Sequence, residues 1–261
     1  MSGYSLRGLH WFNALSAGAS VVEGLPPSLK VADAELGRFI AVVADPDNRF
    51  PRARNGEVGL LEGWGLAKAV DDAISADRDN AKKRPIIAIV DVPSQAYGRR
   101  EEALGIHQAL AGAADSYARA RLAGHPVIAL LVGKAMSGAF LAHGYQANRL
   151  IALRDPGVMV HAMGKASAAR VTLRSVEELE ALASSVPPMA YDIDSYASLG
   201  LLWETLSVQQ IEQPTEEDLT RVTECLKQAI SDVTSTDLKG RLGASNRAAS
   251  SKVRELLRAQ W

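Results

Sequence analysis

The chain has 261 residues, of which 47% are hydrophobic and 23% charged, a balance typical of a globular protein with one large or two small domains. Its 29 basic and 30 acidic residues leave a formal net charge of −1, which excludes an overall field that would draw it onto nucleic acid or an anionic membrane. Cys225 is the single cysteine, so no intramolecular disulfide can form, and no apolar stretch approaches the roughly 18 residues of a membrane span, so we expect a cytoplasmic protein.

The first 30 residues read as an arm. Trp11, Phe12 and Leu15 stand among small residues, and Pro26-Pro27 then breaks the pattern. We predict that residues 1–30 form an N-terminal arm packed on a partner, and that residues 31–261 form a single domain.

Three almost continuously apolar runs follow, at residues 39–44, 85–91 and 126–132. Runs of this length that are rich in β-branched residues predict strands buried on both faces of a sheet. Their spacing of about 40 residues leaves room for a loop and a helix after each, so the pattern predicts an α/β fold with a largely parallel sheet. Ligands in such folds meet the loops at the carboxyl ends of strands.

The second half of the chain predicts shorter elements. We expect strands at residues 149–153 and 158–161, and amphipathic helices at residues 175–184, 216–233 and 245–259.

The third apolar run ends in a turn of small residues, 133–140. Gly138 and Ala139 permit close approach of the backbone, Ser137 can cap the following helix, and free amides at a helix start bind anions or oxyanions. Two alternatives stay open. The small residues could merely let the helix pack on the sheet, or Ser137 could be a hydrolase nucleophile with Asp155 and His161 as its partners.

Two other strand ends carry candidate residues. The loop after residue 91 contains Gln95, Tyr97, Gly98 and Arg99, and it could either cover a ligand or be a solvated turn. The fifth run ends at His161, which could act as a general acid or base or be a hydrogen-bonded structural residue. The five histidines lack metal-ligand spacing, so we expect no metal.

Residues 85–98 and 126–140 resemble the crotonase superfamily and, within it, the acyl-CoA carboxyltransferase branch, through Asp91-Val92-Pro93 and the Gly133 to Gly138 turn. The segments Arg7 to Leu15 and Asp45 to Arg54 resemble the gamma-subunit family of malonate decarboxylases. Two departures, Ser94 and Met136 at positions where glycine is common, weigh against biotin handling more than against the fold.

The resemblance implies a crotonase-like spiral of strand-strand-helix units with a helical C-terminal region. It also implies a heterodimer with a beta subunit, an alpha subunit, and a substrate held on the CoA-like prosthetic group of an acyl carrier protein. This chain would itself bind no cofactor, biotin or metal. The expected reaction is decarboxylation of a malonyl thioester to an acetyl thioester through an enolate held by backbone amides.

The site residues that we expect fall into two groups. The catalytic group is Ser137, Gly138, Ala139, Met163, Gly164 and His161, and the substrate-binding group is Gln95, Tyr97, Gly98, Arg99, Met136 and Lys165. Three alternatives stay open: a carboxyltransferase subunit for another acyl thioester, a stand-alone hydratase or isomerase using Glu101 or Glu102, and a noncatalytic scaffold.

Overall fold

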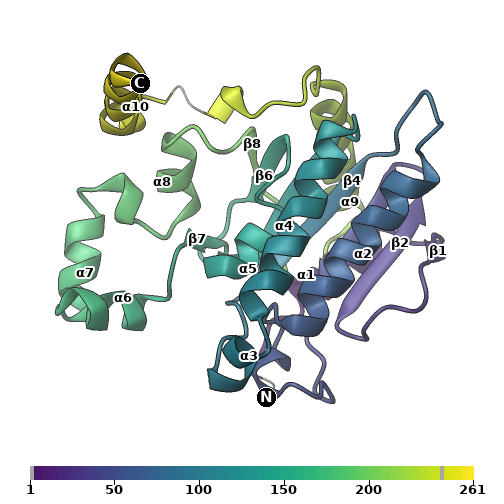
Figure 1. Cartoon of the computed structure of the whole chain (residues 1–261), viewed down its shortest axis with the longest axis horizontal. Coiled ribbons are helices and arrows are strands. Elements are labelled where there is room, and N and C mark those ends of the chain that lie inside the picture. Colours follow the sequence, from purple (N-terminus) through teal and green to yellow (C-terminus); the bar gives the residue numbers. More distant parts are fainter. Residues whose placement is uncertain (1–2, 242–243) are drawn as a thin grey trace.

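The computed structural model describes residues 3–241 and 244–261 and consists of a twisted sheet with helices around it (Figure 1). Within these residues the sheet has eight strands in the order β1-β2-β3-β4-β5-β6-β8, and β7 pairs with the end of β5. The strands are β1 Ser20–Val21, β2 Leu29–Ala34, β3 Gly37–Val42, β4 Ile86–Val92, β5 Val127–Met136, β6 Arg149–Leu153, β7 Met159–His161 and β8 Glu204–Leu206.

The sheet is mixed. Strands β1, β2 and β3 pair antiparallel, whereas all pairings from β3 onward are parallel. Every residue of β3 and β4 is buried, as expected for strands covered on both faces. The α/β class is therefore confirmed, and the parallel part of the sheet is its centre.

The helices in the described residues cover the sheet and extend beyond it. Figure 1 shows α2 and α4 in front of the sheet, and these two helices pack on each other. The α-helices are α1 Arg7–Leu15, α2 Leu60–Ala76, α3 Arg99–Ala103, α4 Ile106–Leu122, α5 Ser137–Ala142, α6 Lys165–Thr172, α7 Val176–Ala183, α8 Ile193–Ser198, α9 Glu216–Ser231 and α10 Ala248–Gln260.

The N-terminal arm packs on this chain's own core. The side chain of Trp11 is 0% exposed, and its indole N–H donates to the carbonyl oxygen of Ile211 at 2.8 Å. Phe12 belongs to the same apolar cluster, and the β1 strand adds to the sheet edge. The apolar side chains of Trp11 and Phe12 are therefore covered by the chain itself, and packing of the arm on a partner stays a prediction. Positions 1 and 2 lie outside the described residues, and the boundary at residue 30 stays a prediction.

The C-terminal half is less compact. Figure 1 shows α6, α7 and α10 extending away from the sheet, and α10 has no buried residue. Ser175 caps α7 and Thr215 caps α9, each in a reciprocal capping box that fixes where the helix starts. The predicted helices at 175–184, 216–233 and 245–259 are confirmed within about three residues at each end.

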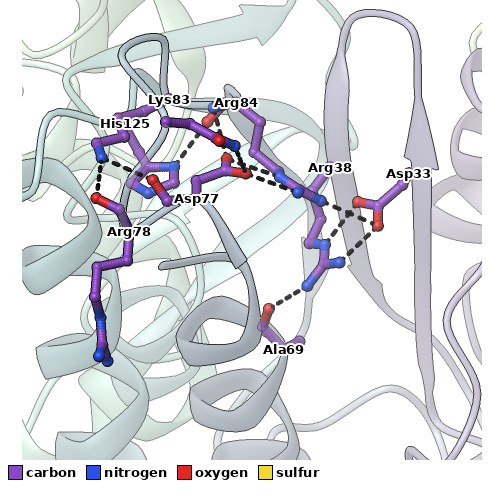
Figure 2. A network of polar contacts seen from close by, with 9 residues as sticks. Asp33, Arg38, Ala69, Asp77, Arg78, Lys83, Arg84 and His125 are labelled. Atoms are coloured by element: carbon purple, nitrogen blue, oxygen red, sulfur yellow. Dashed lines mark hydrogen bonds and ion pairs between the residues drawn. The ribbon is translucent and has the colours of Figure 1, made fainter. Parts of the chain in front are cut away.

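A polar network joins the amino-terminal ends of the central strands (Figure 2). The Arg38 guanidinium donates twice to Asp33 at 2.6 and 2.7 Å and once to the carbonyl oxygen of Ala69. Arg84 donates to both carboxylate oxygens of Asp77 at 2.8 Å. These contacts tie the β2–β3 hairpin, the end of α2 and the start of β4 together, at the opposite end of the strands from the loops that could carry chemistry.

Candidate functional site

The turn between β5 and α5 departs from the expected cap. Met136 occupies the N-cap position of α5, so the prediction that Ser137 caps this helix is wrong. Ser137 instead adopts a left-handed backbone conformation with φ of 57°, and its hydroxyl donates to the carbonyl oxygen of Ala162 at 2.7 Å. The turn is thereby fastened to the loop after β7.

The amide of Gly138 points out of the helix. Its N–H donates to the side-chain oxygen Oε1 of Gln95 at 2.8 Å. Gln95 reaches it from the loop after β4, where it forms a β-bridge with Val58. An oxygen acceptor is thus held at the amide that the sequence indicated as an oxyanion donor.

The carboxylate of Asp91 connects the segments that meet at this turn. Its carboxylate accepts hydrogen bonds from the amides of Lys134 at 3.1 Å and Gly8 at 3.2 Å, so it links β4, β5 and the arm. A Cβ atom at Gly133 would lie 2.0 Å from Asp91 Oδ1. The Asp-x-Pro sequence and the glycine that opens the turn therefore meet at one point, because the carboxylate fills the space that a side chain at position 133 would need.

The third loop follows β7, whose His161 is paired with Met136 of β5. The Nδ1 atom of His161 lies 3.0 Å from the carbonyl oxygen and 3.2 Å from the amide nitrogen of Met163. A protonated Nδ1 can donate to that carbonyl oxygen, and an unprotonated Nδ1 can accept from that amide, so the Met163 backbone bonds Nδ1 in either tautomer. The ring stacks on Tyr191 with a centroid distance of 3.9 Å. Burial lowers the pKa of His161 below its ordinary value of 6.5, so the ring is neutral at pH 7.

Lys165 and Gly164 open α6. The ammonium group of Lys165 pairs with Glu180 at 2.6 Å and lies 5.5 Å from the Tyr191 ring. Gly164 is the exposed N-cap residue of α6, and its Cβ position has no atom within 4 Å. The lysine therefore links α6 to α7, while the glycine is open to solvent.

The structure brings most of the predicted site residues together. The ends of β4, β5 and β7 place Gln95, Met136, Ser137, Gly138, Ala139, His161 and Met163 around one junction. Tyr97, Gly98 and Arg99 lie on the outward side, where α3 begins. Tyr97 is 54% exposed, Arg99 is also exposed, and Gly98 packs against Arg52.

Sequence reasoning missed Tyr191. Its hydroxyl donates to the carbonyl oxygen of Met163 at 2.9 Å, and its ring stacks on the ring of His161. Tyr191 stands 28 residues after Met163 with no motif between them, so the sequence offered no signal for it.

The residues proposed for a serine hydrolase have other partners. Asp155 pairs with Arg7 at 2.8 Å and accepts from the amide of Gly157, while His161 meets Met163 and Ser137 meets a carbonyl oxygen. The three side chains do not form a hydrogen-bonded triad among the described residues. Nor do three or more His, Cys, Asp or Glu side chains gather there as metal ligands, and in the same part of the chain no helix is long and apolar enough to cross a membrane.

The buried central strands, whose ends meet at a small-residue turn with an outward amide, form a mixed α/β fold similar to that of carboxyltransferase (crotonase-like) domains. A chain of transcarboxylase 12S shares this fold with a TM-score of 0.62 at 19% identity, over 88% of this chain and 42% of that one. Within this class, the chain belongs to the malonate decarboxylase gamma subunit family (MdcE), whose model matches residues 53–261.

Solved relatives agree over nearly the whole chain. A chain of a Pseudomonas malonate decarboxylase hetero-tetramer, crystallised in complex with coenzyme A, is 73% identical with a TM-score of 0.94 and covers 98% of this chain and 99% of its own. A chain of the Pseudomonas MdcD–MdcE hetero-dimer is 69% identical with a TM-score of 0.91, over the same shares of the two chains.

A curated relative differs in length. The malonyl-S-ACP:biotin-protein carboxyltransferase MADD of Malonomonas rubra is 36% identical over 182 residues, which are 67% of this chain. The match spans 62% of that protein, so this chain corresponds to part of it.

Proposed function

We propose that this chain forms, with a beta subunit, the site that decarboxylates malonyl-S-acyl carrier protein to the acetyl thioester and CO2. The observation that carries the proposal is the Gly138 amide, which already holds the Gln95 oxygen at 2.8 Å. An amide that binds an uncharged oxygen in this position can bind a thioester oxygen in its place.

The chemistry needs such a donor. When the bond between C2 and the carboxylate breaks, its electron pair moves onto C2 and the thioester oxygen and forms an enolate. A fixed amide at that oxygen stabilises the developing charge without having to reorient, and losing one such donor costs on the order of 3 kcal/mol. Gly138 is the primary donor in this proposal, with the Ser137 and Ala139 amides beside it and those of Met163 and Gly164 on the facing loop.

The neutral state of His161 limits its role. Burial lowers the pKa of His161, so the ring is neutral. Its Nδ1 atom is engaged by the Met163 backbone, which leaves the Nε2 atom to contact substrate or water. Through Nε2, the ring orients the water that protonates C2 after CO2 leaves, and the hydroxide that remains takes up a proton from bulk solvent, so that each turnover consumes one proton. No biotin or metal takes part in this route.

The proposed assembly follows the solved relatives, which were crystallised as an MdcD–MdcE hetero-dimer and as a hetero-tetramer. Exposed apolar side chains in this chain support a partner beside α6 and α10: Val171, Leu173, Val253, Leu256, Leu257 and Trp261. By resemblance, an alpha subunit and the acyl carrier protein complete the complex.

A second candidate is carboxyl transfer to biotin, which the 36% identity to a malonyl-S-ACP:biotin-protein carboxyltransferase favours. The first experiment separates the two. The chain is purified alone and with its beta subunit, malonyl carrier protein is added with and without a biotin protein, and the products are followed by mass spectrometry. Acetyl thioester from the pair without biotin supports decarboxylation; turnover that requires biotin supports transfer.

Paired variants test the Gly138 amide. Gly138→Pro removes the N–H and should lower kcat of the assembled complex by on the order of 100-fold, whereas Gly138→Ala keeps it and should be mild. Ser137→Ala should also be mild, because the proposal gives its hydroxyl no chemical role. Size-exclusion chromatography confirms that each variant assembles. Equal, complete loss in Ser137→Ala and Gly138→Pro would favour a serine nucleophile instead.

A further inference from the structure

Two hydrogen-bonding groups of Met163 face the same nitrogen of His161. The amide nitrogen of Met163 lies 3.2 Å from the Nδ1 atom, and its carbonyl oxygen lies 3.0 Å from it. A neutral imidazole carries one proton, so Nδ1 either accepts from the amide or donates to the carbonyl oxygen, but not both. The choice also decides whether Nε2, the atom left to substrate or water, is a donor or an acceptor.

The hydroxyl of Tyr191 distinguishes the two tautomers. It donates to the carbonyl oxygen of Met163 at 2.9 Å, so that oxygen has a partner without the imidazole. Among the described residues, the Met163 amide has no acceptor other than Nδ1 of His161, and a proton on Nδ1 would leave this amide unpaired in a part-buried loop. With the proton on Nε2, both Met163 groups are bonded, and the positive hydroxyl proton offsets the repulsion between the carbonyl oxygen and the Nδ1 lone pair.

The backbone holds Tyr191 beside the strand that carries His161. The carbonyl oxygen of Tyr191 accepts from the amide of Val160 at 3.1 Å, and the next residue, Asp192, forms a β-bridge with Met159. The Tyr191 side chain is buried, and burial raises the pKa of its hydroxyl above the ordinary value of 10. The hydroxyl therefore stays protonated at neutral pH and is a fixed donor.

Stacking sets the direction of the imidazole. The rings of His161 and Tyr191 have centroids 3.9 Å apart and planes within 13° of parallel. Rotation of the imidazole about its χ2 angle would break this contact, so the ring plane is held. Figure 1 shows β7 next to α5, and His161 of β7 pairs with Met136, which precedes the turn of Gly138. The Nε2 edge is therefore held in a constant orientation relative to that turn.

We propose that Tyr191 is a positioning residue that keeps His161 in the tautomer with its proton on Nε2, so that the ring offers the site a hydrogen-bond donor. The role in turnover rests on the proposed function. There, the C2 electron pair of the enolate takes a proton from water and forms a C–H bond, while the O–H bonding pair stays on the oxygen as hydroxide. An Nε2–H group that donates to this oxygen stabilises the developing charge and leaves the hydrogens of the water free for C2. An unprotonated Nε2 would instead accept one of those hydrogens.

The tautomer is measured directly by ¹⁵N NMR. The full chain, labelled at its histidines and mixed with unlabelled beta subunit, is studied at pH 7, where the ring is neutral, and His161→Gln identifies the signals of this residue. Wild type should show a protonated Nε2 and an unprotonated Nδ1. Tyr191→Phe keeps the stacked ring without the hydroxyl, so the ratio of the Nε2–H to the Nδ1–H form should fall by about tenfold, to comparable populations.

Turnover is measured on the assembled complex as kcat, together with the return of ¹³C-labelled CO2 into malonyl thioester. In Tyr191→Phe, slower protonation of the enolate should lower kcat by about twofold or, where CO2 loss is slower, raise the label returned per acetyl thioester by the same factor. KM should not rise, because the water that protonates C2 does not bind the thioester. Tyr196→Phe is the matched control and should change none of these values, because the buried Tyr196 hydroxyl has no hydrogen-bond partner in the described part of the chain.

Three results would overturn the inference. They are a proton on Nδ1 of wild-type His161, an unchanged tautomer ratio in Tyr191→Phe, and a shifted ratio that alters neither kcat nor label return. Size-exclusion chromatography confirms that the variants assemble. If the wild-type complex forms no acetyl thioester, the proposed function fails, and the NMR spectra still decide whether Tyr191 sets the tautomer.

Discussion

Ser137 holds the turn at the centre of the site in a conformation that costs an L-residue roughly 1–2 kcal/mol. The hydrogen bond from its hydroxyl to Ala162 offsets part of this cost and joins two loops. The strain is confined to the residue before Gly138, where it turns that amide outward. A strained residue beside a proposed donor is consistent with a turn kept for its chemistry.

At the start of the same turn, Gly133→Ala should destabilise the fold by about 2–4 kcal/mol, because its Cβ would displace the Asp91 carboxylate. Thermal unfolding of the purified chain measures the effect. Gly240→Ala is the matched control, since no atom lies within 4 Å of its Cβ position, and it should change stability by less than about 0.5 kcal/mol. Equal stability in the two variants would contradict the role given to Asp91.

His143 is fully buried and neutral. Its Nδ1 lies 3.0 Å from the Tyr117 hydroxyl and its Nε2 lies 2.9 Å from the carbonyl oxygen of Ile89. Burial lowers the pKa of His143 from 6.5 to about 4. The unfolded chain therefore binds a proton more readily than the folded chain does between these values, so stability falls as the pH drops from 6.5 toward 4.

Between pH 6.5 and pH 4, protonation of His143 should lower the free energy of unfolding by on the order of 3 kcal/mol. His143→Gln keeps a donor and an acceptor but does not titrate. It should be less stable than wild type at pH 7 and lose less stability on acidification. Denaturant unfolding at a series of pH values measures both slopes, and parallel curves for the two proteins would show that His143 does not carry the effect.

At the scale of elements, the network of Figure 2 closes the sheet at the end remote from the site. Asp77 follows α2 and Arg84 precedes β4, so their ion pair joins two elements that are adjacent in the sequence. The Arg84 guanidinium holds the pKa of Asp77 well below its ordinary value of 3.8. The pair therefore stabilises the fold above that pH and loses its contribution as the pH falls below it.

Asp77→Ala should lower the free energy of unfolding at pH 7 by about 2 kcal/mol, because it removes the nearly buried partner of Arg84 and leaves that guanidinium paired with Asp33 alone, at 3.3 Å. Asp115→Ala removes an exposed pair with Arg119 and should cost less than about 1 kcal/mol. Chemical denaturation of both variants gives the comparison. A similar small loss in each would mean that Figure 2 shows a surface contact of little energetic weight.

The central strands could be predicted because their apolar runs are long and uninterrupted, as at residues 85–91. The antiparallel strand β2 was missed because Lys30 and Asp33 break its apolar pattern, and its pairing with β3 fixes it instead. Helices α6 and α8 are short and weakly patterned, so their positions depend on contacts with other elements.

The candidate site also has residues that the sequence indicated and contacts that it did not. Gln95, Ser137 and Gly138 lie in strand-end loops with recognisable residues, so the sequence indicated them. The hydrogen bond between Gln95 and Gly138 spans 43 residues, and Tyr191 reaches Met163 over 28 residues. Pairs so far apart in the sequence are brought together by the tertiary fold, and the pattern of neighbouring residues does not predict them.

At the scale of the whole molecule, apolar side chains are unevenly distributed. Val253, Leu256 and Leu257 repeat at helical spacing on α10 and are each at least half exposed, and no residue of that helix is buried. An amphipathic helix without intramolecular packing gains its stability from a partner. Solved relatives crystallised in complexes share the fold over 98% of this chain, which favours the beta subunit as that partner.

Leu256→Asp/Leu257→Asp should therefore weaken association with the beta subunit by at least tenfold, because two apolar contacts would become buried charges. Stability of the isolated chain should not change, since these side chains are exposed in it. Leu122→Asp, at an exposed leucine of α4, is the control. Analytical ultracentrifugation of mixtures measures association, and undiminished binding would show that α10 faces solvent in the complex.

The contact between Gln95 and Gly138 has a consequence for turnover under the proposed mechanism. A neutral carboxamide oxygen is a stronger acceptor than a neutral thioester oxygen, because amide resonance places more negative charge on it, so Gln95 competes with a neutral thioester for the Gly138 amide. An enolate oxygen is a much stronger acceptor and holds the amide while charge is present. Once C2 is protonated, the acetyl thioester is neutral again, and Gln95 can return. The glutamine would then promote departure of the product.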